Sequence, residues 1–210
     1  MQSEGMNPNW AEENLQTIRT LMERSVIYRR ALAPIMLLAG ALGTIAAAIG
    51  ILLPCDSFPK FLTLWFGTVA LAIVGAFLIA RRQALKDQEP FWSPPTRRVA
   101  HALLPPLLSG MFWGIFAALL DLPFEATFLV ALAWIMFYGL ALHAAGFFIS
   151  RGIRWFGWIF VTAVPCTMIF LLIEQPDNLN ANWLMGFFFG VLHLAYGAYL
   201  FLTDKGKNAT

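Results

Sequence analysis

Six long apolar segments without Asp, Glu, Lys or Arg constrain the fold of this 210-residue chain more than any other feature. They cover residues 31–53, 61–80, 99–120, 126–150, 155–173 and 184–202. A helix needs about 20 apolar residues to cross the roughly 30 Å of hydrocarbon in a bilayer. Charged residues make up only 12% of the chain, whereas soluble domains carry about 25%. The sequence therefore predicts an all-α polytopic membrane protein with six transmembrane helices.

The segments between these helices alternate sharply in charge. Every Lys and Arg except Lys60 falls before the first helix, in the second and fourth connections, or after the last helix. The first, third and fifth connections hold Lys60 and the acidic residues Asp56, Asp121, Glu125, Glu174 and Asp177. Because short loops rich in Lys and Arg stay in the cytoplasm, both termini are predicted to be cytoplasmic, in a bacterial inner membrane.

The polar N-terminal region, residues 1–30, is predicted to be a cytoplasmic arm that precedes the membrane domain of residues 31–202. Within it, residues 9–30 have the pattern of an amphipathic helix, since Leu15, Ile18, Met22 and Val26 recur at intervals of three and four. Such a helix lies on the membrane surface or pairs with a partner helix. Residues 203–210 form a cytoplasmic tail.

The longest cytoplasmic connection, RRQALKDQEPFWSPPTRR at residues 81–98, sets two aromatic residues among three prolines. Phe91 and Trp92 belong to the residue types that favour the membrane interface. One interpretation is that they enter that interface or pack under the helices. The other is that they form a stiff docking site for a partner protein.

The three helical hairpins share a plan. A proline marks each outer turn, at Pro54, Pro123 and Pro176, and the following helix carries two spaced glycines. These pairs are Gly67 and Gly75, Gly139 and Gly146, and Gly190 and Gly197. Glycines about two turns apart share a helix face and let helix backbones approach each other in lipid. We therefore expect three hairpin repeats arranged around a pseudo-threefold axis.

The turn prolines and glycine pairs, across residues 37–202, resemble those of the bacterial HdeD-like membrane proteins. That resemblance implies six helices and a link to acid resistance. The polar N-terminal region and the proline-rich segment 81–98 depart from the pattern of that family. The segment NLQTIRTLMERSVIYRRALAPI, from Asn14, is similar to bacterial membrane proteins of unknown function.

Histidines are the only ionisable side chains predicted at depth in the membrane, and such groups are candidates for function. His143 and His193 lie on corresponding helices at similar depths. One hypothesis makes them axial ligands of a haem b. A second makes each a neutral ring hydrogen-bonded across a helix contact, to Tyr138, Tyr196 or a threonine. A third places them on a path for a polar solute.

No pattern of a catalytic, metal-binding or nucleic-acid-binding site is present in the sequence. The leading hypothesis is a non-enzymatic membrane protein that supports or regulates a partner or a membrane stress response, through residues 81–98 or 9–30. The alternatives are a transporter or channel for a neutral or weakly polar solute, and a haem-binding electron-transfer subunit. The sequence leaves the oligomeric state open.

Overall fold

The computed structural model describes residues 8–53, 57–88, 90–120, 122–174 and 180–207, and these contain helices and turns but no strand. The side chains of residues 8–14, 16–30 and 204–207 are not described. The elements are α1 (Pro8–Leu52), α2 (Phe58–Lys86), α3 (Pro94–Leu119), the 3₁₀ turn η1 (Phe124–Ala126), α4 (Thr127–Gly146), α5 (Arg151–Glu174), α6 (Ala181–Met185), the π-helix η2 (Gly186–Val191) and α7 (Leu192–Lys207).

Six helical segments are long and apolar enough to cross a membrane, which confirms the predicted number of spans. They run over Ala31–Leu52, Phe58–Lys86, Pro94–Leu119, Phe124–Gly146, Arg151–Glu174 and Ala181–Thr203. The last one joins α6, η2 and α7 into a single sixth span. The chain is therefore a multi-pass membrane protein by the length and composition of its helices.

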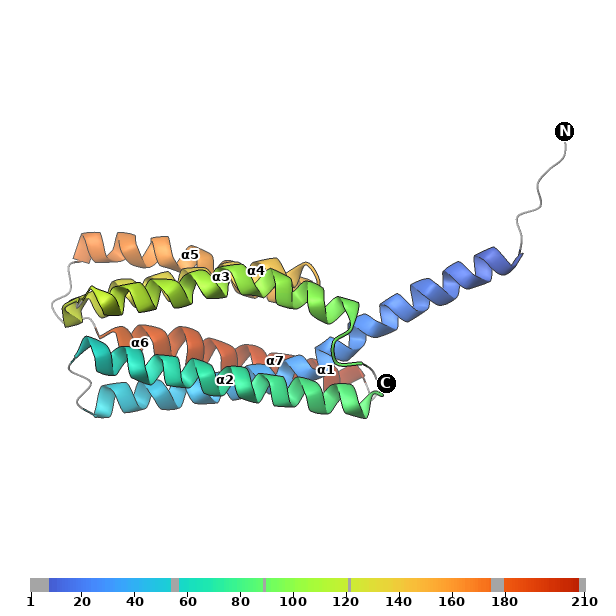
Figure 1. The fold of residues 1–210 in the computed structure, drawn as a ribbon, viewed down its shortest axis with the longest axis horizontal. Helices are drawn as coiled ribbons and strands as arrows, with labels where there is room; N and C mark the ends of the chain where they lie inside the picture. The colour runs from blue at the N-terminus through green and yellow to red at the C-terminus, as the bar shows by residue number, and fades with distance from the viewer. Residues whose placement is uncertain (1–7, 54–56, 89, 121, 175–179, 208–210) are drawn as a thin grey trace, which may run out of the picture.

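The six spans form two layers of three helices (Figure 1). In the first layer, α1 is central and contacts α2 on one side and the sixth span on the other. In the second layer, α4 is central and contacts α3 and α5. Backbone contacts between the layers are sparse and join α2 to α3 and α4 to α6. The packing therefore follows two layers instead of the predicted threefold arrangement of hairpins.

Along the sequence, the chain divides into two units of three spans that run in opposite directions, and each unit contributes helices to both layers. The first unit is α1 to α3 and the second is α4 to α7, with α1 and α4 running in opposite directions through the bundle (Figure 1). In each unit the first helix contacts the second, as α1 contacts α2 and α4 contacts α5. Each first helix also contacts the last helix of the other unit. Corresponding helices thus have corresponding neighbours.

The predicted long connection 81–98 is much shorter in the structure, because helix extends into it from both sides. α2 continues to Lys86, since Arg, Gln, Ala, Leu and Lys all favour helices. Gln88 then takes a positive φ of 53° that ends the helical path. Pro94 and Pro95 occupy the first turn of α3, where a missing N–H costs nothing. Only residues 87–93 connect the two helices.

The N-terminal segment 9–30 is helical, but it is continuous with the first span as part of α1. It extends away from the layers beyond the end where α7 finishes (Figure 1). Leu15, the only residue of this segment whose side chain is described, is exposed. The amphipathic character of the arm stays a prediction.

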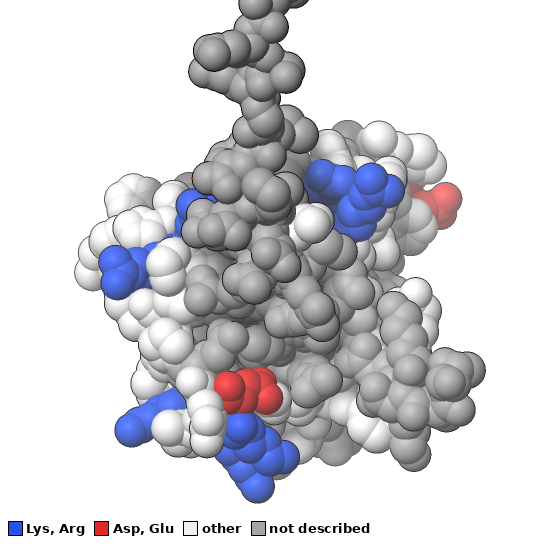
Figure 2. All heavy atoms as spheres, turned by 90° about the vertical axis from the view of Figure 1, so that its right-hand side faces the viewer, with Lys and Arg blue, Asp and Glu red and all other residues white. Residues whose placement is uncertain are grey.

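Basic side chains gather at the end of the bundle that faces the viewer in Figure 2. The described ones come from the end of α2, the start of α3 and the start of α5: Arg81, Arg82, Lys86, Arg97, Arg98, Arg151 and Arg154. We call this the basic end. Lys60, Glu125 and Glu174 belong to helix ends at the opposite side, and Asp56, Asp121 and Asp177 lie outside the described residues. The charge asymmetry seen in the sequence is thus an asymmetry of the folded bundle.

Glycines bring the helices of each layer into backbone contact. A Cβ atom added to Gly190 would lie 3.0 Å from the Thr44 backbone nitrogen, and one added to Gly139 would lie 3.0 Å from the Gly157 carbonyl oxygen. Gly146 faces the Arg154 backbone in the same way. Gly67 is the exception among the predicted pairs, because nothing lies within 4 Å of its position.

Replacing Gly43 by alanine is expected to destabilise the protein by about 1–3 kcal/mol, because the new Cβ would lie 2.5 Å from the Phe189 carbonyl carbon. Gly67→Ala is the matched control. It meets open space and removes the helix penalty of glycine, so the free energy of unfolding should stay equal or rise by up to about 1 kcal/mol. Unfolding of the purified protein in mixed micelles measures both. Equal losses for the two variants would contradict the assigned α1 contact.

Candidate functional site

The sixth span contains a π-helical segment, η2, in its middle. Its sequence is GFFFGV, in which Gly186 and Gly190 flank three phenylalanines. Both glycines face α1, at Ala47 and Thr44, so that side of the segment lies close to another backbone. A π-helical turn accommodates an extra residue and is frequent at functional sites. Its immediate effect here is to set the position of His193, which follows in α7.

His193 is almost fully buried, at 1% exposure, and both of its ring nitrogens are hydrogen-bonded. Nδ1 lies 2.9 Å from the carbonyl oxygen of Phe188, and Nε2 lies 2.7 Å from the hydroxyl of Tyr138. Because a carbonyl only accepts, Nδ1 carries a proton. In the neutral ring Nε2 is then the acceptor, and Tyr138 donates to it. The hydrogen bond joins α4 to α7 and therefore links the two layers.

Aromatic rings enclose this hydrogen-bonded pair. Phe156 and Phe160 of α5 pack edge-on to the imidazole, with their ring centroids 5.3 and 5.7 Å from its centroid. Phe189 stacks on it at 6.0 Å. Tyr196, one turn further along α7, stacks on Phe156 at 4.5 Å. The imidazole therefore sits in a packed aromatic cluster between the layers.

A second buried polar cluster lies nearer the opposite end of the bundle. Asn182 of α6 is fully buried and accepts a hydrogen bond of 2.9 Å from Nε1 of Trp65 in α2. Its side-chain nitrogen donates to the Gly50 carbonyl of α1 at 3.1 Å and to Oδ1 of Asn180 at 3.0 Å. One side chain thus ties the three helices of the first layer together.

His143 occupies a different environment from His193. It is half-buried on α4, with its ring edge-on to Phe147 at 5.3 Å and to Trp158 of α5 at 5.0 Å. Its Nδ1 is buried and has no hydrogen-bond partner within the described structure. None of the rings that contact His143 contacts His193, so the structure does not bring the two histidines together.

Of the three hypotheses for the histidines, the hydrogen bond across a helix contact is confirmed for His193, with Tyr138 as partner. The haem hypothesis requires a free ring nitrogen on each histidine, and both nitrogens of His193 are engaged within the protein. Nδ1 of His143 has no tyrosine or threonine partner among the described residues.

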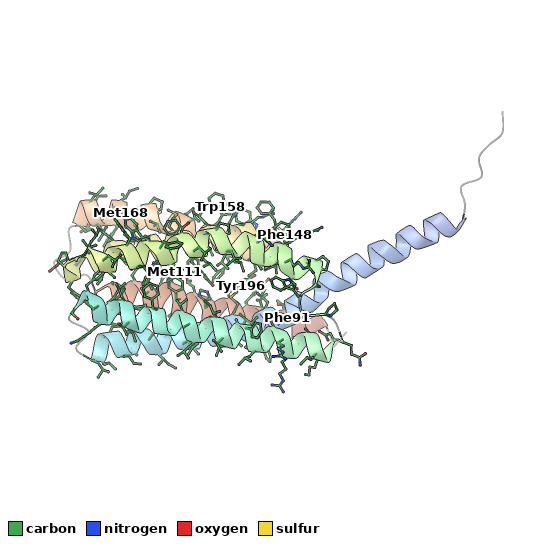
Figure 3. The ribbon with its side chains drawn as sticks, in the orientation of Figure 1. Phe91, Met111, Phe148, Trp158, Met168 and Tyr196 are labelled. Carbon is green, nitrogen blue, oxygen red and sulfur yellow. The ribbon has the colours of Figure 1, made fainter. Side chains whose placement is uncertain are left out.

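Phe91 and Trp92 differ in their surroundings. The ring of Phe91 packs edge-on to Phe77 of α2 at 5.1 Å, at the basic end of that helix (Figure 3). Trp92 is 54% exposed. Phe91 therefore holds the connection against α2, as the packing interpretation expects, while Trp92 presents its indole to the exterior.

Sequence reasoning missed Asn182 and its partner Trp65. The predicted sixth span began at residue 184, so Asn182 was assigned to a connection, although the span begins at Ala181. An asparagine followed by a long apolar run is the signal that was available, since a polar side chain in a span must find a partner.

Comparisons of the chain with protein families, with curated proteins and with solved structures find no match.

Replacing Tyr138 by phenylalanine is expected to lower the free energy of unfolding by about 0.5–2 kcal/mol, because it leaves Nε2 of His193 buried without a donor. Tyr199→Phe is the control, since Tyr199 is exposed on α7. Unfolding in mixed micelles measures both variants. If Tyr138→Phe were as stable as the original protein, the hydrogen bond would contribute nothing to the contact between layers.

Proposed function

We propose that this chain is a non-enzymatic protein of a bacterial inner membrane that supports or regulates a partner protein or a membrane stress response. The observation that carries the proposal is the contrast between a packed interior and a protruding basic end. Between the layers, large aromatic rings surround the hydrogen-bonded imidazole of His193. At the basic end, Trp92 is exposed and the first part of α1 extends beyond the bundle.

The connection 87–93 is suited to present Trp92 to a partner. It is short, its start is set by the positive φ of Gln88, and Phe91 anchors it on Phe77. At its end, the hydroxyls of Ser93 and Thr96 lie 2.9 Å apart and brace the first turn of α3. A partner that binds an exposed tryptophan held between the Phe91 anchor and the first turn of α3 loses little conformational freedom, which favours binding.

Transport of a neutral or weakly polar solute is the second hypothesis that the sequence offers. The two three-helix units run in opposite directions through the bundle, and some transporters are built from two such inverted units. The residues predicted to line the path do not support it, because Tyr138 and His193 bond to each other within the aromatic cluster. We therefore propose the partner role and not transport.

A photo-crosslinking amino acid at position 92 is expected to capture one reproducible protein in native membranes, because the Trp92 side chain is exposed. In a second experiment the crosslinker is placed in the N-terminal arm, and Trp92→Ala should then abolish the crosslinked complex. Mass spectrometry of the adduct identifies the partner.

The matched control places the same crosslinker at Trp155, a tryptophan near the basic end that is 67% exposed on α5. It should give lipid adducts or none. Failure to capture a protein from position 92 and from every position of the arm would remove the support for a partner role.

The proposal includes an orientation with both termini in the cytoplasm, because short loops rich in Lys and Arg stay on that side. A phosphatase fusion after Glu125 is expected to be active, and one after Arg151 inactive, in intact cells. The reverse pattern would place the basic end outside and would contradict the orientation.

A further inference from the structure

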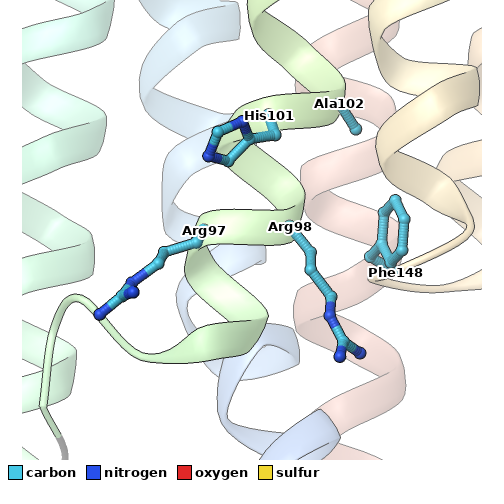
Figure 4. Close-up of a pocket in the computed structure, with 5 residues that line it drawn as sticks. All are labelled: Arg97, Arg98, His101, Ala102 and Phe148. Atoms are coloured by element: carbon cyan, nitrogen blue, oxygen red, sulfur yellow. The ribbon is translucent and has the colours of Figure 1, made fainter.

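The seam between α3 and α4 carries two hollows that the proposed function does not use. The first lies at the basic end, has a volume of about 360 Å³, and is lined by Arg97, Arg98, His101, Ala102 and Phe148 (Figure 4). The second has a volume of about 490 Å³. Its lining residues are Ser109, Phe112, Trp113, Ile115, Phe116, Leu119 and Phe137.

The first hollow is cationic. Arg98 and Ala102 lie on the side of α3 that faces Phe148, while Arg97 extends to the other side (Figure 4). Neither guanidinium has a carboxylate partner among the residues that the structure describes, and no acidic residue lines the hollow. Beside it, Arg154 holds its guanidinium 4.9 Å from the ring centre of Phe147. These charges favour an anion.

The second hollow is apolar and lies deeper along α3. Phe148, which follows the end of α4, lines the first hollow, and Phe137 of α4 lines the second. On α3, Arg98 lines the first hollow and Ser109 the second, eleven residues away, which corresponds to about 16 Å along a helix. On α3, Arg98, Ala102, Ser109 and Phe116 are separated by intervals of four and seven, so they share one face. The separation matches the thickness of one bilayer leaflet, which is about 15 Å.

Hydrogen bonding keeps this seam in place. Nε1 of Trp134 in α4 donates to the Gly110 carbonyl of α3 at 2.9 Å, level with the second hollow. Gly110 and Gly114 are buried against α4, whereas Leu108 and Phe112 beside them are exposed. The seam therefore combines a basic hollow at headgroup level with an apolar hollow at acyl-chain depth.

We propose that this seam binds one anionic phospholipid of the leaflet at the basic end. The headgroup phosphate lies between Arg98 and Phe148, while Arg97 and His101 bound the same hollow from the other side of α3, where Arg97 adds a second positive charge. One acyl chain follows the seam from Ala102 to Ser109 and ends in the hollow lined by Phe112 and Phe137. Charge selects the headgroup, and the length of the seam selects a lipid over a free phosphate.

The test measures binding of phosphatidylglycerol to the full chain in detergent by native mass spectrometry, with phosphatidylcholine as the reference lipid. Arg98→Gln should weaken binding about fivefold, and Arg97→Gln with Arg98→Gln about 30-fold. The control is Arg81→Gln with Arg82→Gln, which removes the same charge from exposed positions on α2 at the same end. It should leave binding within twofold.

A second pair of measurements separates the lipid from its headgroup. Ser109→Trp, which fills the apolar hollow from an exposed position, should weaken binding of long-chain phosphatidylglycerol but not of the six-carbon form. Inorganic phosphate at 100-fold excess should not displace the long-chain lipid.

Three results would overturn the proposal. Equal losses in the two arginine pairs would show attraction by general charge alone. Displacement by inorganic phosphate would show a site for a soluble anion. An unchanged preference for the long chain in Ser109→Trp would show that no acyl chain lies in the seam.

Discussion

Close contact between helix backbones is the constraint on which the rest of this structure depends. Lipid provides no hydrophobic force that drives apolar helices together, so contact area and packing must hold them. Glycines supply this contact within each layer, where Gly43 and Gly190 bring α1 against the sixth span and Gly139 and Gly157 bring α4 against α5. Because the small residues are used within the layers, the space between the layers is left for large side chains.

The buried polar groups add specific hydrogen bonds to the packing of the aromatic side chains between the layers. Apolar packing between Phe160, Phe188 and Phe189 has many near-equivalent arrangements, whereas a hydrogen bond has one. The bond between Tyr138 and His193 fixes the second layer against the first. Asn182 fixes three helices within the first layer. Both sites act at positions where water cannot replace a lost partner, which makes an incorrect arrangement costly.

The six spans were predictable because the hydropathy of a segment is a sum along the chain. Each apolar residue contributes to that sum independently of its neighbours in space. The helix ends were not predictable, since Arg81 to Lys86 form helix as readily as loop, and prolines at 94 and 95 begin a helix as readily as they interrupt one. Among the site residues, Tyr138 was one of several partners predicted for the histidines, beside Tyr196 and a threonine, and the structure selects it for His193. Asn182 was not predicted, because its role depends on Trp65, which lies 117 residues away.

Glycine spacing indicates which face of a helix is small, but it does not indicate which helix covers that face. Gly139 and Gly190 occupy equivalent places in the predicted hairpin plan, yet the first contacts α5 and the second contacts α1. Gly67 fits the plan equally well, yet a Cβ atom added there would meet no other helix among the described residues within 4 Å. The neighbour of each helix is therefore determined by the complementary residue across the contact, such as Thr44 or Gly157. For this reason, helices with similar glycine spacing can belong to units that run in opposite directions. The complementary residue lies in a different part of the sequence, so a comparison of the helices for repeated patterns does not identify it.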